Sequence, residues 1–447
     1  MKNNKKKNKK IPIWKKIVLG LESLVVVVYL IMTVFYVWMK VDKKGFISYF
    51  ATNPLVRMYL NNTTKKDYVE KVQDTNYDKE KVVVNEGLSE EIETYRSIAL
   101  FGIDSRGSEF DDSAHSDTII VMSINNKTHE VKMASVYRDT MLKIVDEDGD
   151  VSYTKCNSAF FKAGPECAIN MLNTNLDLNI TDYVVVNFNG IANIIDALGG
   201  IEVNLTSDEQ FYVNGYLTET RLITGMDTPD LSEWGENVHL TGLQATAYCR
   251  IRYVAFYDED GTVYNNDMGR TARQRSVIKK LVAKAKDAGV GQVLNIANTI
   301  LNYNTEDEKI IGTSLSFDEV MDLIPTLIDF SLSGSEGFPF TCDTPTINGA
   351  SMVVAQGLSY NVTKLHEFLF DEKNYLPSDT VNNISDYLET YTGIPTVKLA
   401  EDREDDYGYH NDIESDDDDS RYDNDDNDSR YNSDNDDNYN AYDYGYR

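Results

Sequence analysis

The longest run of apolar residues in the chain lies near its N-terminus. Residues 17–39 carry a single formal charge, Glu22. A helix of this length reaches about 35 Å, enough to cross a hydrocarbon core of about 30 Å. Trp14 before the run and Tyr36 and Trp38 near its end match the aromatic residues that favour membrane interfaces. The pattern predicts a transmembrane helix over 17–39, in preference to a cleaved signal peptide or a buried core helix.

The charges on either side of this segment predict its orientation. Residues 1–16 contain eight Lys and no acidic residue, and only a short Lys cluster follows at 40–44. The positive-inside rule therefore places 1–16 in the cytoplasm. Because no second apolar run of comparable length occurs in the sequence, we expect a single-pass protein of the cell membrane, with the chain from about residue 41 onward extracellular.

Two further segments differ in composition from a globular core. Residues 40–95, which include a Lys/Glu-rich stretch of modest helical periodicity, are predicted to form a stalk. Residues 398–447 are predicted to be a disordered acidic tail, because positions 401–447 hold nineteen Asp and Glu, four Arg and almost no aliphatic residue. A solvated spacer is the simplest role for this tail. Its tyrosines leave a cation-binding or wall-associating role open.

Short apolar runs typical of strands begin after the predicted stalk. A first strand is predicted at 97–103, and two more at 118–124 and 131–137 around a turn-forming segment. The latter two form a hairpin. In a symmetric register, Asp117 lies opposite Arg138 at the open end of this hairpin.

Other charged residues are expected at the same edge. Asp104 and Arg106 follow the strand at 97–103, and Asp139 follows Arg138. If the first strand is a neighbour in the same sheet, two carboxylates and two guanidinium groups converge there. Such a set suits a divalent cation together with a phosphate. The alternative is a set of surface ion pairs that contributes little energy.

Helical and extended patterns alternate further along the chain. A helix is predicted at 167–172, a strand at 182–188, a helix at 190–198 that ends at two glycines, and a strand at 201–205. This alternation predicts an α/β fold with a mixed central β-sheet flanked by helices.

Arginines concentrate in a second region, five of them within 26 residues. Arg250 and Arg252 share a face only in extended backbone, where they could clamp a phosphate. Arg270, Arg273 and Gln274 stand at i, i+3 and i+4 of a predicted helix and are expected to point the same way. Solvated surface charges are the alternative for each arginine. In a chain of net charge −30, however, this concentration favours anion binding.

Composition excludes several classes of function. A net charge of −30 argues against a general nucleic-acid-binding protein. The sequence has no nucleotide-binding Gly loop, zinc-spaced His/Cys set or Ser-His-Asp pattern, and His115, the histidine nearest the proposed site, is expected in an exposed loop. Cys156, Cys167, Cys249 and Cys342 allow three complete disulfide connectivities, or four free thiols.

Taken together, these segments resemble the LytR-CpsA-Psr (LCP) family of membrane-anchored cell-wall phosphotransferases. The matching stretches are 100–106, 116–118, 135–140, 155–159, 196–201, 250–252 and 269–275. They are weak singly but specific as an ordered set. The resemblance implies one LCP-like catalytic domain over 96–397.

The family transfers anionic glycopolymers from a polyprenyl diphosphate carrier to peptidoglycan and releases polyprenyl phosphate. For this chain the resemblance implies a phosphotransferase that acts on a teichoic acid or capsule-like polymer, with Mg²⁺ as cofactor. Its partners would be the lipid-linked glycopolymer, peptidoglycan and membrane lipid. Charge on the transferring phosphoryl group would be neutralised by the metal and by guanidinium groups.

The resemblance also assigns roles to residues. Asp104 and Asp117 would hold Mg²⁺, directly or through water. Asp139 or one of these two acids would act as base for the acceptor hydroxyl. The diphosphate would be bound by Arg106, Arg138, Arg250, Arg252, Arg270, Arg273 and Gln274, of which Arg106, Arg138 and Arg250 are expected to be catalytic with Asp104 and Asp139. The lipid tail is expected in an apolar groove between sheet and helices, which the sequence does not locate.

Two other functions fit the same motifs. One is a non-catalytic receptor that binds a lipid diphosphate and regulates envelope processes. The other is a hydrolase that cleaves the polyprenyl diphosphate with water.

Overall fold

The computed structural model describes residues 29, 32–104, 115–258, 261–287, 290–305 and 308–397. The described residues belong to one unit, which ends at Val397. The predicted cytoplasmic segment 1–16, the acidic tail 398–447 and Arg106 lie outside the described residues, as does most of the predicted span 17–39. Within the described part of the chain, none of the helices combines the length and apolar character needed to cross a membrane.

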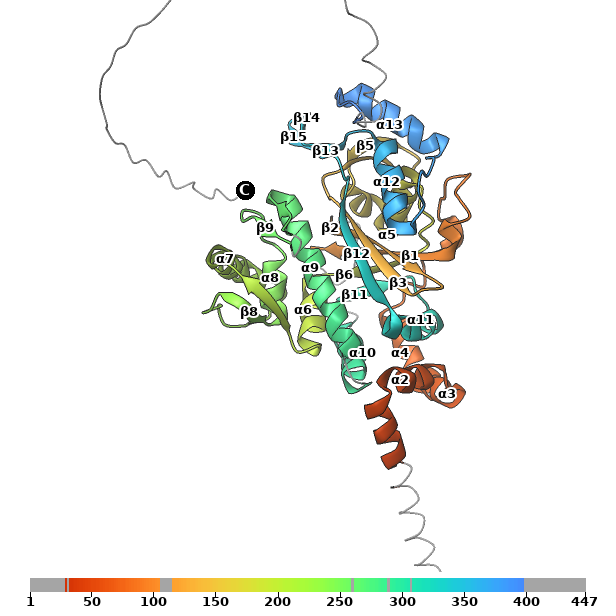
Figure 1. Ribbon diagram of the computed structural model, residues 1–447, viewed down its shortest axis with the longest axis vertical. Coiled ribbons are helices and arrows are strands. Elements are labelled where there is room, and N and C mark those ends of the chain that lie inside the picture. Colours follow the sequence, from red (N-terminus) through yellow and green to blue (C-terminus); the bar gives the residue numbers. More distant parts are fainter. Residues whose placement is uncertain are drawn as a thin grey trace, which may run out of the picture. The chain divides into compact units, whose positions relative to one another are not determined.

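A six-stranded mixed sheet forms the centre of the fold (Figure 1). In spatial order its strands are β11 (Ile311–Thr313), β6 (Asp182–Val186), β1 (Tyr95–Ile103), β2 (Ser116–Asn125), β3 (Glu130–Val136) and β12 (Ser331–Phe338). β1 runs antiparallel to β2 and parallel to β6, and β3 runs antiparallel to β2 and parallel to β12. The predicted mixed sheet is therefore confirmed.

The register of the β2–β3 hairpin is the one that its sequence symmetry predicts. Ile120 pairs with Ser135, and Val121 pairs with Ala134. The Asn125 side chain accepts hydrogen bonds from the backbone N–H groups of Lys127 and Thr128 and so closes the turn.

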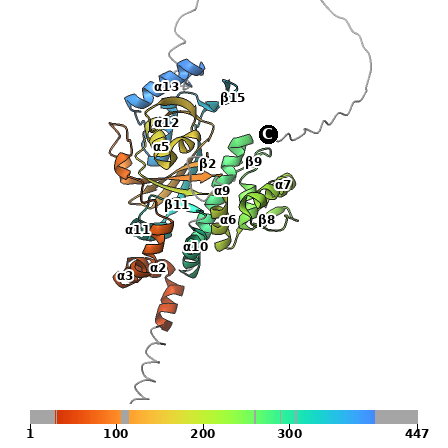
Figure 2. The same ribbon diagram turned by 180° about the vertical axis from the view of Figure 1, so that it is seen from behind.

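Strand alternation sends side chains to two separate cores, one on each face of the sheet. Phe101 and Val121 face α5 (Ser158–Leu176) and α12 (Leu358–Phe370), with α13 (Asp379–Thr392) completing this core. Leu100 and Met122 face α9 (Asn266–Asp287) and α11 (Phe317–Asp329). Figure 2 shows the helices on both faces from behind.

A further core lies beside the sheet, built by the elements between β6 and α9. They are α6 (Phe188–Ala197), β7 (Ile201–Leu205), α7 (Ser207–Thr224), β8 (Gly235–Leu240) and α8 (Gly242–Tyr248). The predicted strand 201–205 is present, but it pairs with β8 and not with the central sheet. Val277 and Leu281 of α9 join this core. α9 therefore links the sheet to the neighbouring layer.

Local sequence signals explain where several of these helices begin. Thr206 with Glu209, Thr241 with Gln244, and Ser316 with Glu319 each form a capping box, in which the side chains at the two ends of the motif satisfy backbone N–H groups. Gly242 is needed where α8 crosses α6, because a Cβ atom there would lie 1.9 Å from the Ala192 carbonyl oxygen.

The remaining described elements are short or peripheral. They are α2 (Lys43–Thr52), α3 (Pro54–Thr63), α4 (Lys65–Lys71), η1 (Lys79–Lys81), η2 (Ile92–Thr94), β4 (Met141–Val145), β5 (Val151–Lys155), β9 (Phe256–Tyr257), β10 (Val263–Tyr264), α10 (Val290–Tyr303), β13 (Cys342–Asp343), β14 (Thr346–Ile347), β15 (Ala350–Ser351) and β16 (Val354–Ala355).

The stalk prediction requires residues 54–94 to stand apart from the domain, but they pack against it. Leu60 and Tyr68 pack on Phe317 and Met321 of α11. Further along, the Val83 N–H donates to the side chain of Asn170 in α5. The apolar positions of this segment are therefore satisfied by the domain, and the separate stalk predicted for 40–95 is wrong over this part.

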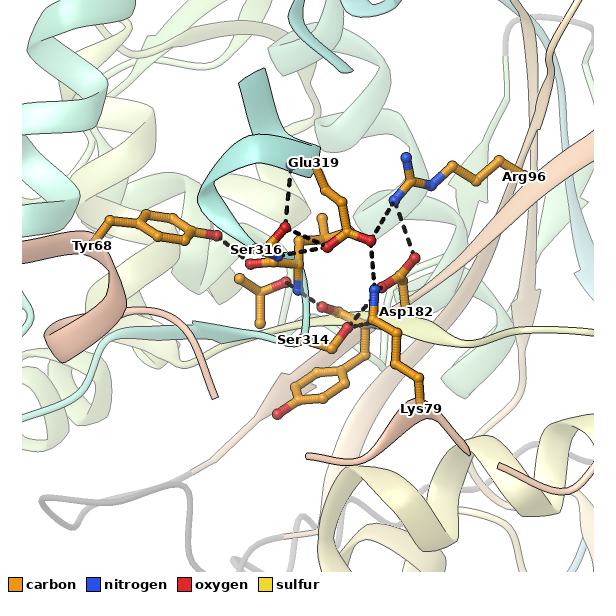
Figure 3. Close-up of polar contacts among 10 residues, drawn as sticks. Tyr68, Lys79, Arg96, Asp182, Ser314, Ser316 and Glu319 are labelled. Atoms are coloured by element: carbon orange, nitrogen blue, oxygen red, sulfur yellow. Dashed lines mark hydrogen bonds and ion pairs between the residues drawn. The ribbon is translucent and has the colours of Figure 1, made fainter. Parts of the chain in front are cut away.

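A cluster of four charged side chains fastens the same segment to the sheet (Figure 3). Lys79 Nζ lies 2.6 Å from Asp182 Oδ1 and 2.7 Å from Glu319 Oε1. Arg96 Nη2 lies 3.1 Å from Asp182 Oδ2. We call Lys79, Arg96, Asp182 and Glu319 the base cluster, because it lies at the end of the sheet where β1 and β6 begin.

Candidate active site

Charged side chains from three strands meet at the opposite end of the sheet. Asp104 follows the last residue of β1, Asp117 is the second residue of β2, and Arg138 follows β3. Arg138 Nη1 donates to Asp117 Oδ1 at 2.7 Å. The predicted pairing of Asp117 with Arg138 is confirmed. It arises because antiparallel pairing sets the end of β1 and the end of β3 beside the start of β2.

The first turn of α9 adds an acid and a second guanidinium group to this edge. Asn266 has a φ of 52°, in the left-handed region that Asn tolerates better than most residues. Asp267 and Arg270 follow. Arg270 Nη1 lies 3.5 Å from Asp117 Oδ2, and Arg270 Nε lies 3.1 Å from Asp267 Oδ1. The sequence analysis missed Asp267, although its position three residues before an arginine in a helical first turn is a usable signal.

Asp267 has a central position among the arginines. Its Oδ1 lies 3.6 Å from Arg138 Nε and 3.7 Å from Arg252 Nε, in addition to its contact with Arg270. We call Asp117, Arg138, Arg252, Asp267 and Arg270 the rim cluster. In this cluster two carboxylates hold three guanidinium groups. Asp117, Arg252 and Arg270 line the cavity described below, whereas Arg138 and Asp267 stand behind them and are not among its lining residues.

Burial and charge act in opposite directions on these groups. Burial acts to raise the pKa of Asp117, but Arg270 and Arg138 outweigh it and hold that pKa below its ordinary value. Burial likewise acts to lower the pKa of Arg138, but Asp117 and Asp267 raise it overall. For Arg270, burial dominates and lowers the pKa. All three groups nevertheless stay charged near neutral pH.

Part of the hydrogen-bonding capacity of the rim cluster is unused. Arg138 Nε, Arg270 Nε and Asp267 Oδ1 are buried, and none has a hydrogen-bond partner among the described residues. The nearby ion pairs supply attraction without hydrogen-bond geometry. Two buried N–H donors of this kind are suited to an anionic ligand.

Arg250 and Arg252 lie in the loop that follows α8. Arg250 Nη2 contacts Glu219 Oε2 at 2.9 Å, and its guanidinium group lies over the rings of Phe188 and Tyr216. Both arginines line one cavity with Asp104, Asp117, Arg270 and Gln274. The expectation that Arg250 and Arg252 serve one site is therefore consistent with their placement.

This cavity has a volume of about 480 Å³ and extends from the charged edge between the sheet and the neighbouring helices. Its walls away from the charges are apolar. The sheet contributes Leu100, Ile120, Val184, Val186 and Ile311, and the helices contribute Phe188, Ile191, Ile194, Val277 and Ile278. An apolar groove of the kind expected for the lipid tail therefore exists between the sheet and α6 and α9.

The structure contradicts the predicted orientation of Arg273. Its side chain is 0% exposed and faces away from the cavity. It pairs with Glu209 at 3.0 Å and donates to the carbonyl groups of Ile251, Val254 and Ala255. Arg273 thus holds the loop that carries Arg252 and does not face a ligand.

Asp139 is also absent from the residues that line the cavity. Its carboxylate lies 2.9 Å from Lys155 Nζ. All four cysteines are free thiols, which matches the alternative without disulfides: Cys156, Cys167, Cys249 and Cys342. His115 is exposed and lies against the ring of Phe161.

Comparison with known proteins assigns the chain to a family. A family model, the LytR_cpsA_psr family, matches residues 56–360. The chain belongs to this family. The match begins within α3, which agrees with the packing of residues 54–94 on the domain.

Several relatives of this LytR_cpsA_psr protein carry a common name. The polyisoprenyl-teichoic acid–peptidoglycan teichoic acid transferase TagU of Bacillus mycoides is 31% identical over 51% of this chain and 62% of its own length. The TagU of Halalkalibacterium halodurans is 33% identical over 51% of this chain and 63% of its own. The chain thus matches less than two thirds of the length of these relatives. Among solved structures, protein gbs0355 from Streptococcus agalactiae is 22% identical, with a TM-score of 0.49 and coverage of 72% of this chain and 99% of the other.

Proposed function

We propose that this protein transfers an anionic glycopolymer, of teichoic acid or capsule type, from a polyprenyl diphosphate carrier to peptidoglycan, with release of polyprenyl phosphate. The observation that carries the proposal is the continuity of the charged edge with the apolar cavity. A lipid-linked diphosphate has the same two parts, a dianionic group and a hydrocarbon tail. The names of the relatives, which are teichoic acid transferases, support the same reaction.

The charges of the site suit a diphosphate that arrives with a divalent cation. Four guanidinium groups and four carboxylates balance to zero: Arg138, Arg250, Arg252 and Arg270 against Asp104, Asp117, Glu219 and Asp267. A magnesium diphosphate is itself close to neutral. When the magnesium diphosphate binds, the arginines can exchange their carboxylate partners for phosphate oxygens, and the carboxylates can turn to the cation. No charge is then left buried without a partner.

The residues present fit Mg²⁺. Mg²⁺ prefers oxygen ligands, and it commonly takes one or two carboxylates from the protein and the rest from phosphate and water. Asp104 and Asp117 both line the cavity and would supply those carboxylates. No group of three or more His, Cys, Asp or Glu side chains able to hold a metal occurs in the described part of the chain. The bound cation would neutralise negative charge on the diphosphate.

In the proposed reaction, the acceptor hydroxyl attacks the phosphorus that bears the glycopolymer, and the bond from this phosphorus to the bridging oxygen breaks. The electron pair leaves with polyprenyl phosphate. The unused Nε–H groups of Arg138 and Arg270 are placed to donate to phosphoryl oxygens as their charge develops. Asp139 is a poor candidate for the base because it does not line the cavity. Asp104 and Asp117 do line it, and Asp117 is already paired with Arg138 and Arg270, which favours Asp104.

We further propose that residues 17–39 span the membrane and that the domain stands outside it, with 1–16 in the cytoplasm. The described part of this segment supports the proposal, because residues 32–41 are helical and most of their apolar side chains, among them Met32, Val34 and Tyr36, are exposed. A helix that leaves such side chains without protein contacts suits a lipid environment.

A single reconstitution tests the function. The full chain is incubated with a polyprenyl diphosphate-linked saccharide, Mg²⁺ and a peptidoglycan oligomer, and the products are separated by mass. We expect a covalent conjugate of saccharide phosphate and oligomer. Release of the saccharide phosphate or of inorganic phosphate without a conjugate would indicate a hydrolase. Binding of the lipid without turnover would indicate a receptor.

A further inference from the structure

The outer face of α3 carries a row of apolar side chains that the fold leaves uncovered. Leu55, Met58 and Tyr59 stand at i, i+3 and i+4 and are 71%, 58% and 65% exposed. They therefore share one face of the helix. The inner face is occupied, since Leu60 packs on α11 and Arg57 pairs with Asp322 of the same helix.

The position of α3 in the chain limits what can cover this row. The helical residues that end the predicted span are fixed to α2 by ring contacts, with the Trp38 ring 5.4 Å from that of Phe46 and 5.2 Å from that of Tyr49. α2 has 10 residues and is joined to α3 through Asn53, which caps the N-terminus of α3. Since 10 helical residues extend about 15 Å, α3 cannot lie far from the point where the span leaves the bilayer.

The base cluster keeps this arrangement in place relative to the sheet. Glu319 belongs to α11, on which α3 and α4 pack, and it is tied through Lys79 and Arg96 to the start of β1 and β6 (Figure 3). The membrane-proximal helices are thus attached to the end of the sheet opposite the candidate active site.

We propose that the face of α3 formed by Leu55, Met58 and Tyr59 is embedded in the interface of the lipid bilayer. The inference rests on the membrane anchoring proposed above. A helix beside a membrane anchor whose exposed face is apolar and includes a Tyr is typical of an interfacial helix. β1 has nine residues, so the domain would hold its charged rim about 30 Å from the membrane surface.

The proposal predicts which peptides contact lipid. The full chain is reconstituted into vesicles of phosphatidylethanolamine and phosphatidylglycerol that contain a lipid with a photoreactive group near the carbonyl end of one acyl chain. After irradiation and digestion, labelled peptides are identified by mass spectrometry. We expect label on residues 54–63. Peptides with Phe211 and Leu222 of α7, whose exposed fractions are 73% and 82%, are an internal control and should carry none.

A variant separates lipid contact from simple exposure. The triple substitution Leu55→Ser, Met58→Ser, Tyr59→Ser should reduce label on 54–63 several-fold without lowering the thermal midpoint, because these side chains make few contacts with the protein. Transfer from a donor embedded in vesicles should fall, whereas transfer from a donor in detergent micelles should stay at the level of the unsubstituted chain.

The outcomes distinguish this inference from the proposals on which it rests. Label on 29–41 without label on 54–63 would overturn the interfacial position of α3 and leave the anchor standing. Absence of label from both segments would overturn the anchor as well. Equal labelling of α3 and α7 would also overturn the inference. The labelling itself does not depend on transferase activity.

Discussion

The two ends of the central sheet each carry a cluster of charged side chains, and the clusters differ in how completely they are satisfied. None of the side chains of the base cluster has a buried polar atom without a hydrogen-bond partner among the described residues. In the rim cluster, Arg138 Nε, Arg270 Nε and Asp267 Oδ1 are buried without such partners. The base cluster is therefore complete without a ligand, whereas the rim cluster retains donors for one.

The difference also appears in the surroundings of the two clusters. Ser316 of the α11 capping box donates to Glu319 through its backbone N–H at 2.8 Å and its hydroxyl at 2.7 Å. At the rim, three arginines share two acids beside a cavity of about 480 Å³. The comparison shows that ion pairs of similar length and composition can have different roles, depending on whether their hydrogen-bonding groups are all used. A closed set holds elements together, whereas an open set has polar groups left over for a ligand.

The largest expected effect concerns the base cluster. The double substitution Lys79→Ala, Arg96→Ala leaves the Asp182 carboxylate, whose side chain is 6% exposed, without a cationic partner. Removal of the partners of a buried charge costs about 3–5 kcal/mol in free energy of unfolding, which urea denaturation measures. Adding Asp182→Asn should recover part of the loss. Activity per folded molecule should be unchanged, and a loss of activity without a loss of stability would break the comparison.

Substitutions in the rim cluster and at Arg250 should have the opposite effect: they should lower the rate of transfer and leave the stability of the fold nearly unchanged. Arg138→Ala and Arg250→Ala should each reduce the rate of transfer by about 10²–10³-fold, because each removes a charged donor to the diphosphate. The thermal midpoint should change by no more than a few degrees. Arg221→Ala, at an ion-paired arginine on α7 outside the cavity, is the matched control. Unchanged transfer in both variants would remove the arginines from the mechanism.

A smaller effect is expected for Asp267→Asn, which keeps the shape of the side chain but removes the charge that holds three arginines. We expect kcat to fall by about tenfold, since misplacement of positioning groups by even 1 Å is costly. Binding of diphosphate, measured by calorimetry, should not weaken, because a competing anion has been removed. Weakened binding with unchanged kcat would show that Asp267 does not position the arginines.

The smallest effect is a change in acid stability at the base. Burial acts to raise the pKa of Glu319, but hydrogen bonds from Lys79 and Ser316 lower it to about 2. A carboxyl whose folded-state pKa is depressed contributes stability above its unfolded pKa of about 4.3, and this contribution disappears as the pH falls towards about 2. Glu319→Gln should therefore flatten the dependence of the unfolding free energy on pH between those values. The gain is modest because the side chain is 36% exposed and solvent screens its charge. An unchanged pH profile would contradict the role of this group.

Much of the rim could be predicted from sequence because it depends on local pairing. The hairpin register follows from alternation and from a turn that Asn125 closes, and it brings Asp117 to Arg138 without reference to the rest of the fold. The parts that could not be predicted depend on packing between distant elements. Examples are the position of Asp267 among three arginines and the attachment of residues 54–94 to α11 and α5.

The sequence by itself therefore determined the hairpin, the helix starts and the residue types of a phosphate site, because these depend on periodicity, caps and composition. Only the tertiary structure decided the roles of Arg270 and Arg273. The two side chains leave α9 about 60° apart, close enough for a pattern to group them. One meets Asp117 and Asp267 at the rim, and the other meets Glu209 and loop carbonyls in the interior. Helical spacing fixes the direction of a side chain along its own helix, but the elements packed against that helix decide what it binds.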